Sequence, residues 1–166
     1  EALGFPLIIM DGYEADDVIG TLVPMIKEAG FHTLISTGDK DLAQLVDEQV
    51  ILINTMNNTR LDEAGVIAKF GVKPTQIIDY LSLMGDSADN IPGIPGVGPK
   101  TAVKWLTTYQ TLENVIANAD LITGKIGEKF RAHIDNLALS KKLVTLKCDI
   151  KPTFSLSDLV KKPSDN

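Results

Sequence analysis

The sequence has few of the features that would link the chain covalently or hold it in a membrane. Its 166 residues include one cysteine, Cys148, so no disulfide forms within the chain and a reducing, cytoplasmic setting is expected. The longest apolar run, Phe5 to Met10, is too short to cross a bilayer, and no signal peptide is predicted. Aromatic residues make up only 5%, which argues against base stacking as the main way of binding nucleic acid.

The composition that remains is typical of a globular protein with an uneven charge distribution. Apolar residues reach 44% and charged residues 23%, enough for a core without disulfides. Residues 1–90 hold fifteen acidic and five basic side chains, whereas residues 91–166 hold seven acidic and eleven basic ones. The first half is therefore suited to binding cations and the second to binding phosphates, although chance also produces such differences.

Apolar spacing predicts an α/β part, residues 1–90, followed by an all-helical part, residues 91–166. In the first part, alternating strands and helices favour a parallel sheet with flanking helices. Residues 1–4 resemble the last turn of a helix, and residues 161–166 a polar linker. The predicted strands are 7–10, 33–36 and 50–53, and the predicted helices are 16–29 (kinked near Pro24), 40–46, 62–70, 74–84, 101–107, 111–119 and 127–146.

Three acidic clusters stand at comparable places in the predicted first part. Two follow strands, and the carboxyl ends of parallel strands share one edge of a sheet, so we expect them to converge there. Acidic residues also cap helices and form turns, but each cluster holds more of them than a cap needs, and Lys40 is the one basic residue among them. Oxygen ligands of this kind suit Mg²⁺ or Mn²⁺, and two such ions suit phosphodiester hydrolysis. The candidate metal-binding and catalytic residues are Glu14, Asp16, Asp17, Asp39, Asp41, Asp86 and Asp89.

A glycine-rich loop leads directly into a predicted helix at the start of the second part. Gly96 and Gly98 allow a sharp turn with exposed amides, and Pro99 suits a first helical turn. Together with the helix dipole and nearby lysines, this loop is typical of a phosphate-binding site that contacts the DNA backbone regardless of sequence. A plain connection between two helices is the alternative. The candidate DNA-binding residues are Gly96, Val97, Gly98, Lys100, Thr101, Lys104 and Lys129.

Four ordered motifs resemble the 5′ nuclease domain of bacterial DNA polymerase I, which is related to flap endonucleases. They are Glu14-Ala15-Asp16-Asp17, Ser36-Thr37-Gly38-Asp39-Lys40-Asp41, Leu83-Met84-Gly85-Asp86-Ser87-Ala88-Asp89-Asn90-Ile91-Pro92-Gly93 and Pro95-Gly96-Val97-Gly98-Pro99-Lys100-Thr101-Ala102. The resemblance covers nearly the whole chain. It implies a PIN-like nuclease core followed by a helix-hairpin-helix-type subdomain, with metal-dependent 5′ to 3′ exonuclease and flap endonuclease activity in replication and repair.

The resemblance also implies roles for individual residues and a set of partners. Glu14, Asp16 and Asp17 would serve one divalent ion, and Asp39, Asp41, Asp86 and Asp89 a second. The loop at 93–98 would hold duplex phosphates, with K⁺ between its carbonyls and the DNA. The implied substrate is branched or nicked duplex DNA with a 5′ end or flap, bound by a monomer that is tethered to a polymerase module.

The family domain begins with a further segment that this chain lacks, so the chain is expected to be a fragment whose activity alone is in doubt. Two other functions stay open at this point. One is a non-catalytic helix-hairpin-helix DNA-binding module. The other, ranked lower, is a haloacid-dehalogenase-like phosphatase, because Ser36-Thr37-Gly38-Asp39 faintly resembles its acidic loop, although Asp11-Gly12-Tyr13 does not supply the Asp-x-Asp nucleophile.

Overall fold

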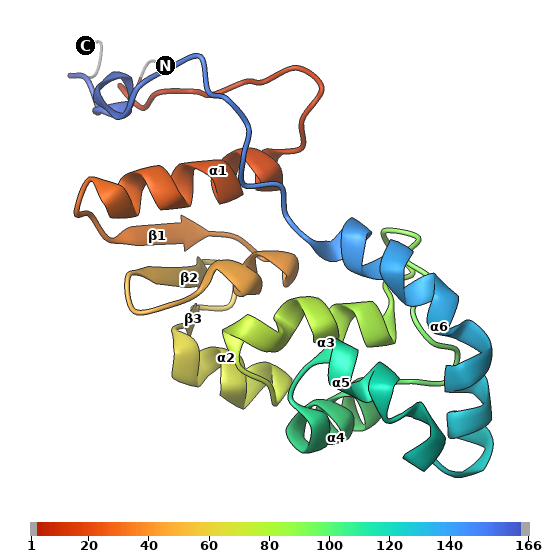
Figure 1. The fold of residues 1–166 in the computed structure, drawn as a ribbon. Coiled ribbons are helices and arrows are strands. Elements are labelled where there is room, and N and C mark those ends of the chain that lie inside the picture. Colours follow the sequence, from red (N-terminus) through yellow and green to blue (C-terminus); the bar gives the residue numbers. More distant parts are fainter. Residues whose placement is uncertain (1–2, 164–166) are drawn as a thin grey trace. The chain divides into compact units, whose positions relative to one another are not determined.

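A computed structural model describes residues 3–163 of the chain (Figure 1). The chain divides into two compact units, Glu1–Thr33 with Lys147–Asn166, and Leu34–Leu146, and each unit is described by itself below. The predicted helix end at residues 1–4 lies partly outside the described residues, as does the linker predicted at 161–166. Among the described residues, none of the helices is long and apolar enough to span a membrane.

The first unit is built around one long helix, α1 (Ala15–Glu28), close to the predicted helix 16–29. The C-terminal segment of this unit is bonded to the buried side of α1. The Thr21 hydroxyl donates to the Lys147 carbonyl (3.3 Å) and accepts from the Ile150 amide (3.3 Å). A short 3-10 helix, η4 (Leu156–Leu159), follows in this segment. The strand predicted at 7–10 is wrong: these residues have no regular structure, and Ile9 is 76% exposed.

The second unit opens with a three-stranded sheet in the order β1 (Thr33–Ser36), β2 (Val50–Asn54), β3 (Thr59–Leu61). The first two strands were predicted from apolar runs, and the helix predicted between them is the 3-10 helix η1 (Asp41–Leu45). The third was not predicted, and it pairs antiparallel with β2, so the sheet is not purely parallel. A turn with Asn58 at φ 54 brings Thr59 opposite Asn54, and this pairing turns a three-residue segment into a strand.

Helices make up the rest of the second unit, and the bounds follow local stop signals. The helix α2 (Glu63–Phe70) starts at Asp62, whose carboxylate accepts from the Gly65 amide (2.9 Å), and ends at the left-handed Gly71. The predicted helix 74–84 is a 3-10 turn, η2 (Pro74–Gln76), that continues into α3 (Ile77–Met84). The remaining elements are α4 (Pro99–Tyr109), α5 (Leu112–Ala117), η3 (Ala119–Leu121) and α6 (Gly124–Val144), close to the three predicted helices.

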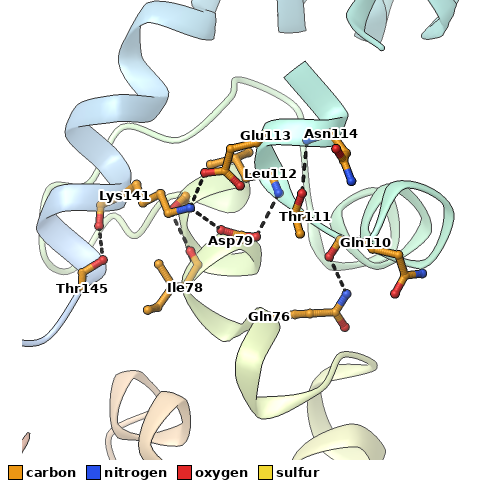
Figure 2. Close-up of polar contacts among 11 residues, drawn as sticks. Gln76, Ile78, Asp79, Gln110, Thr111, Leu112, Glu113, Asn114, Lys141 and Thr145 are labelled. Atoms are coloured by element: carbon orange, nitrogen blue, oxygen red, sulfur yellow. Dashed lines mark hydrogen bonds and ion pairs between the residues drawn. The ribbon is translucent and has the colours of Figure 1, made fainter. Parts of the chain in front are cut away.

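The helix α3 lies at the centre of this helical packing, against α4, α5 and α6. Its Asp79 is 7% exposed and accepts from the Leu112 amide at the start of α5 (2.9 Å). Lys141 of α6 contacts the other Asp79 oxygen (3.0 Å) and also Glu113 (2.6 Å), as Figure 2 shows. One buried carboxylate therefore links three helices through charge-assisted bonds.

Candidate functional site

The first acidic pair follows β1 in a turn stabilised by its own side chains. The amide of Asp39 donates to the Thr37 hydroxyl (2.9 Å), and the amide of Asp41 donates to the Asp39 carboxylate (2.9 Å). Asp39 is exposed, and Asp41 starts η1 and is half-buried. The alternative role of Asp39 was to cap the following helix, but the N-cap of η1 is Lys40, and the Asp39 carboxylate instead stabilises the turn before it.

The second acidic pair lies in a closed loop after α3. Asp86 and Ile91 exchange two backbone hydrogen bonds (2.9 and 2.7 Å), and the Asp86 carboxylate accepts from the Ala88 amide (2.9 Å). The base of the loop is closed by two glycines, since a Cβ on Gly93 would overlap the backbone nitrogen of Gly85. The loop thus holds Asp86 and Asp89 in a defined backbone geometry.

Lys40 connects the two acidic pairs. Its ammonium forms an ion pair with Asp86, 46 residues further along the chain, and the Asp86 side chain is only 8% exposed. This hydrogen bond is the main reason why the pKa of Asp86 is lowered, and it raises the pKa of Lys40 against the effect of burial. The ion pair therefore brings the acidic loops after β1 and after α3 together, as the predicted shared site would require.

Asp41 is the member of this group with an unsatisfied hydrogen-bond acceptor. Its Oδ1 is buried and has no hydrogen-bond partner. Burial, and then the negative charge of Asp39, raise its pKa to about 6. No three acidic, histidine or cysteine side chains among the described residues already form a group that could hold a metal ion. The Asp41 Oδ1 atom nevertheless fits a site for a hard cation. Such ions bind through carboxylate oxygens, and a bound ion would give this buried oxygen the partner that it lacks.

The third acidic cluster belongs to the first unit. Glu14 is exposed at the N-cap of α1, and Asp16 and Asp17 stand in its first turn. One Asp17 oxygen accepts from the Lys147 amide (2.8 Å), so this carboxylate has a structural contact that was not predicted. The convergence of this cluster with the other four carboxylates stays a prediction.

The glycine-rich loop forms the tight turn that was predicted, in a left-handed conformation at Gly96 (φ +88). Gly98 is the N-cap of α4 with Pro99 at its first position, and nothing lies within 4 Å of a Cβ placed on Gly98. Lys129 of α6 reaches this loop, since its Nζ would lie 3.6 Å from a Cβ on Gly96. An open turn, a helix N-terminus and a lysine are thus combined in one place.

The other predicted DNA-binding residues differ in how they are presented. Lys100 and Lys104 are exposed on α4, and Thr101 is half-buried, with its amide donating to the Gly98 carbonyl (3.0 Å). Val97 is only 6% exposed, so its side chain belongs to the core and its backbone alone remains for a ligand. Sequence reasoning did not identify the Gly85–Gly93 contact, which depends on how the loop closes, or the partner of Lys40, which lies 46 residues away in the chain.

Two family models match the chain. The N-terminal resolvase-like domain of 5′-3′ exonucleases matches residues 1–71, and their C-terminal SAM fold matches residues 72–166. The fold and the site thus define a nuclease class in which a resolvase-like domain precedes a helical SAM fold. The chain belongs to the 5′-3′ exonuclease family.

Curated relatives are named 5′-3′ exonuclease or DNA polymerase I. The chain is 47% identical to a 5′-3′ exonuclease of Aquifex aeolicus over 165 residues, which are 98% of this chain and 56% of that protein. It is 48% identical to DNA polymerase I of Pseudomonas aeruginosa over 170 residues, covering 95% of this chain and 18% of the polymerase. The chain therefore spans only part of each of these relatives.

Solved structures share the fold. A mutant of the T5 5′-exonuclease superposes with a TM-score of 0.79 at 24% identity, covering 86% of this chain and 59% of the T5 protein. A further structure shows the bacteriophage T5 flap endonuclease in a pseudo-enzyme-product complex with DNA and metal ions, with a TM-score of 0.79 at 23% identity. Another T5 structure contains zinc.

Proposed function

We propose that the chain carries metal-binding and DNA-binding parts of a structure-specific 5′ nuclease. Its substrate would be branched or nicked duplex DNA, cut at a 5′ end or flap in replication and repair. The observation that carries this proposal is the buried, unpartnered oxygen of Asp41 beside three other carboxylates. Such an oxygen is costly to leave alone, and a divalent cation removes that cost.

The proposed ligands fall into two sets, each contained in one unit. Asp39, Asp41, Asp86 and Asp89 of the second unit would hold one Mg²⁺ or Mn²⁺ ion, and the set Glu14, Asp16 and Asp17 would hold another. When bound, a divalent ion of this kind would activate water and stabilise the charge of an in-line displacement. The protein's part is to hold the carboxylates in place, which the closed loop at Asp86 and the turn at Asp39 support.

The glycine-rich loop would bind the DNA backbone. The open turn at Gly96 and Gly98, the N-terminus of α4 and the ammonium of Lys129 all favour an anion. None of these groups selects a base, so we expect affinity that is independent of sequence and falls with salt. A K⁺ ion at the 93–98 loop belongs to the same proposal.

The similarity to DNA polymerase I of Pseudomonas aeruginosa supports a tether to a polymerase module. In that arrangement the nuclease would act as a monomer joined to the polymerase module.

A cleavage assay tests the proposed function. The full-length protein is incubated with a DNA labelled at a 5′ flap, in Mg²⁺ or in chelator. We expect product in Mg²⁺ only, and a loss of at least about a hundredfold in Asp41→Asn. Asp135→Asn, an exposed aspartate on α6, is the matched control and keeps its activity. Equal product in chelator would show that the carboxylates do not act through a metal.

Binding is tested separately from cleavage. In chelator, Lys129→Ala should lower affinity for duplex DNA about equally across sequences and reduce the salt slope by about one. Loss of affinity on only some sequences would contradict contact with phosphates alone. A protein that binds DNA but never cuts it would instead be the non-catalytic binding module.

A further inference from the structure

The ion pair between Lys40 and Asp86 places a cation inside the acidic group of the second unit. The ammonium belongs to the turn after β1, and the carboxylate to the loop after α3. The Asp86 side chain is 8% exposed, whereas the Lys40 side chain is 38% exposed and has a path to solvent. The lysine can therefore leave without unfolding its surroundings, while the carboxylate stays where it is.

Lys40 is the basic residue whose charge acts on both Asp41 and Asp86. Asp39 and Asp41 flank it in sequence, and with Asp86 all three raise the pKa of its ammonium. Burial acts against this charge, so the aspartates and not the solvent hold the lysine there. One monovalent ammonium thus stands at the place where several negative charges meet.

This single cation leaves the group incompletely neutralised. Lys40 lowers the pKa of Asp41, yet burial and the charges of Asp39, Asp89 and Asp86 raise it to about 6. The Oδ1 of Asp41 still lacks any donor. A divalent cation brings twice the charge and several coordination positions, so it satisfies the same oxygens better than an ammonium does.

We propose that Lys40 is a resident counter-ion that a divalent metal ion displaces from Asp86 when it binds. This inference rests on the proposed function, since it concerns the state of that metal site before the metal ion binds. Lys40 and the metal ion compete for the same carboxylate. By linkage, the apparent metal affinity equals the intrinsic affinity multiplied by the fraction of molecules in which Asp86 is free of Lys40. Displacement also frees an ammonium next to the site.

A calorimetric titration with Mn²⁺ measures the competition. In the full-length protein, Lys40→Met should bind Mn²⁺ about five- to tenfold more tightly than the natural protein, because Asp86 is then always available. Lys142→Met, which removes an exposed lysine from the last turn of α6, is the control for net charge and should change affinity by less than about twofold. Unchanged or weaker binding by Lys40→Met overturns the inference.

A spectroscopic measurement separates displacement from simple long-range attraction. The NMR signal of the Lys40 side-chain ammonium, assigned by its loss in Lys40→Met, should be protected from exchange in the metal-free protein. Saturation with Mg²⁺ should abolish that protection. A signal that stays protected while Mg²⁺ is bound would show that Lys40 remains on Asp86, and the inference is then wrong.

The metal-dependent function and the displacement of Lys40 are contradicted by different results. If the natural protein binds neither ion specifically, the proposed metal-dependent function fails, whatever Lys40 does. If the natural protein binds the ions but Lys40 is not displaced, only the inference fails.

Discussion

The amide of Gly93 donates a buried hydrogen bond to the hydroxyl of Ser140, over 3.2 Å. Gly93 closes the loop that carries Asp86 and Asp89, and Ser140 is a fully buried residue of α6. The helix whose N-terminal half brings Lys129 to the glycine-rich loop therefore also holds the acidic loop in place. One rigid element thus supports both candidate sites of the second unit.

Replacing Ser140 by alanine should destabilise the protein by about 1–3 kcal/mol, because the Gly93 amide then has no acceptor in a buried place. Urea denaturation in chelator measures this loss. Ser87→Ala, an exposed serine of the same loop, is the control and should change stability by less than about 0.5 kcal/mol. Similar losses in the two variants would mean that the buried hydrogen bond contributes little.

The raised pKa of Asp41 predicts a specific pH dependence of stability without metal. The pKa of this carboxyl is about 6 in the folded protein against an ordinary value of 3.8, so the folded state binds the proton more tightly. Its stabilising contribution is then complete below about pH 3.8 and is lost as the pH rises through about 6.

Asp41→Asn cannot lose a proton in this range. Relative to the natural protein, its free energy of unfolding should rise between about pH 4 and pH 6 and then level off. Urea denaturation across this range in chelator makes the comparison, and Asp135→Asn serves as the control with no such trend. A constant difference between Asp41→Asn and the natural protein would contradict the burial of an ionised Asp41.

Local sequence was sufficient for elements that carry their own signals. Asp62 and Gly71 mark the ends of α2, and the apolar runs of β1 and β2 gave both strands. By contrast, β3 depends on pairing with β2, which a segment of three residues does not encode. The apolar residues at 7–10 predicted a strand, but a short apolar run does not provide a neighbouring strand to pair with.

The same limit applies to the candidate site. The grouping of Asp39, Asp41, Asp86 and Asp89 around one ion was implied by the resemblance to the 5′ nuclease domain. Strand order by itself predicted only that the clusters at 14–17 and 39–41 converge. The ion pair of Lys40 with Asp86 could not be predicted, since 46 residues separate the partners. The Asp17 contact to Lys147 likewise joins distant segments, and only folding shows it.

Asp79 should be among the most sensitive positions of the helical part. Asp79→Ala removes the acceptor of the Leu112 amide and the partner of Lys141, so we expect a loss of about 3 kcal/mol in urea denaturation (Figure 2). Glu113→Gln is the matched test in the same network. The Glu113 side chain is 65% exposed, and the variant should lose less than about 1 kcal/mol. Equal losses would show that Asp79 does not organise the network.

Gly98 offers a test in which stability and DNA binding separate. The backbone there is extended at φ −110, and nothing lies within 4 Å of an added Cβ, so Gly98→Ala should fold with a change of about 1 kcal/mol or less. The space that the Cβ would fill is the space that a phosphate needs to approach the N-terminus of α4. Affinity for duplex DNA should therefore fall about tenfold while the unfolding transition is nearly unchanged.

Gly30→Ala, at another open glycine but with φ +82, is the converse control, because it strains the backbone without affecting DNA affinity. Undiminished DNA binding by Gly98→Ala would place the phosphate contact elsewhere on the chain.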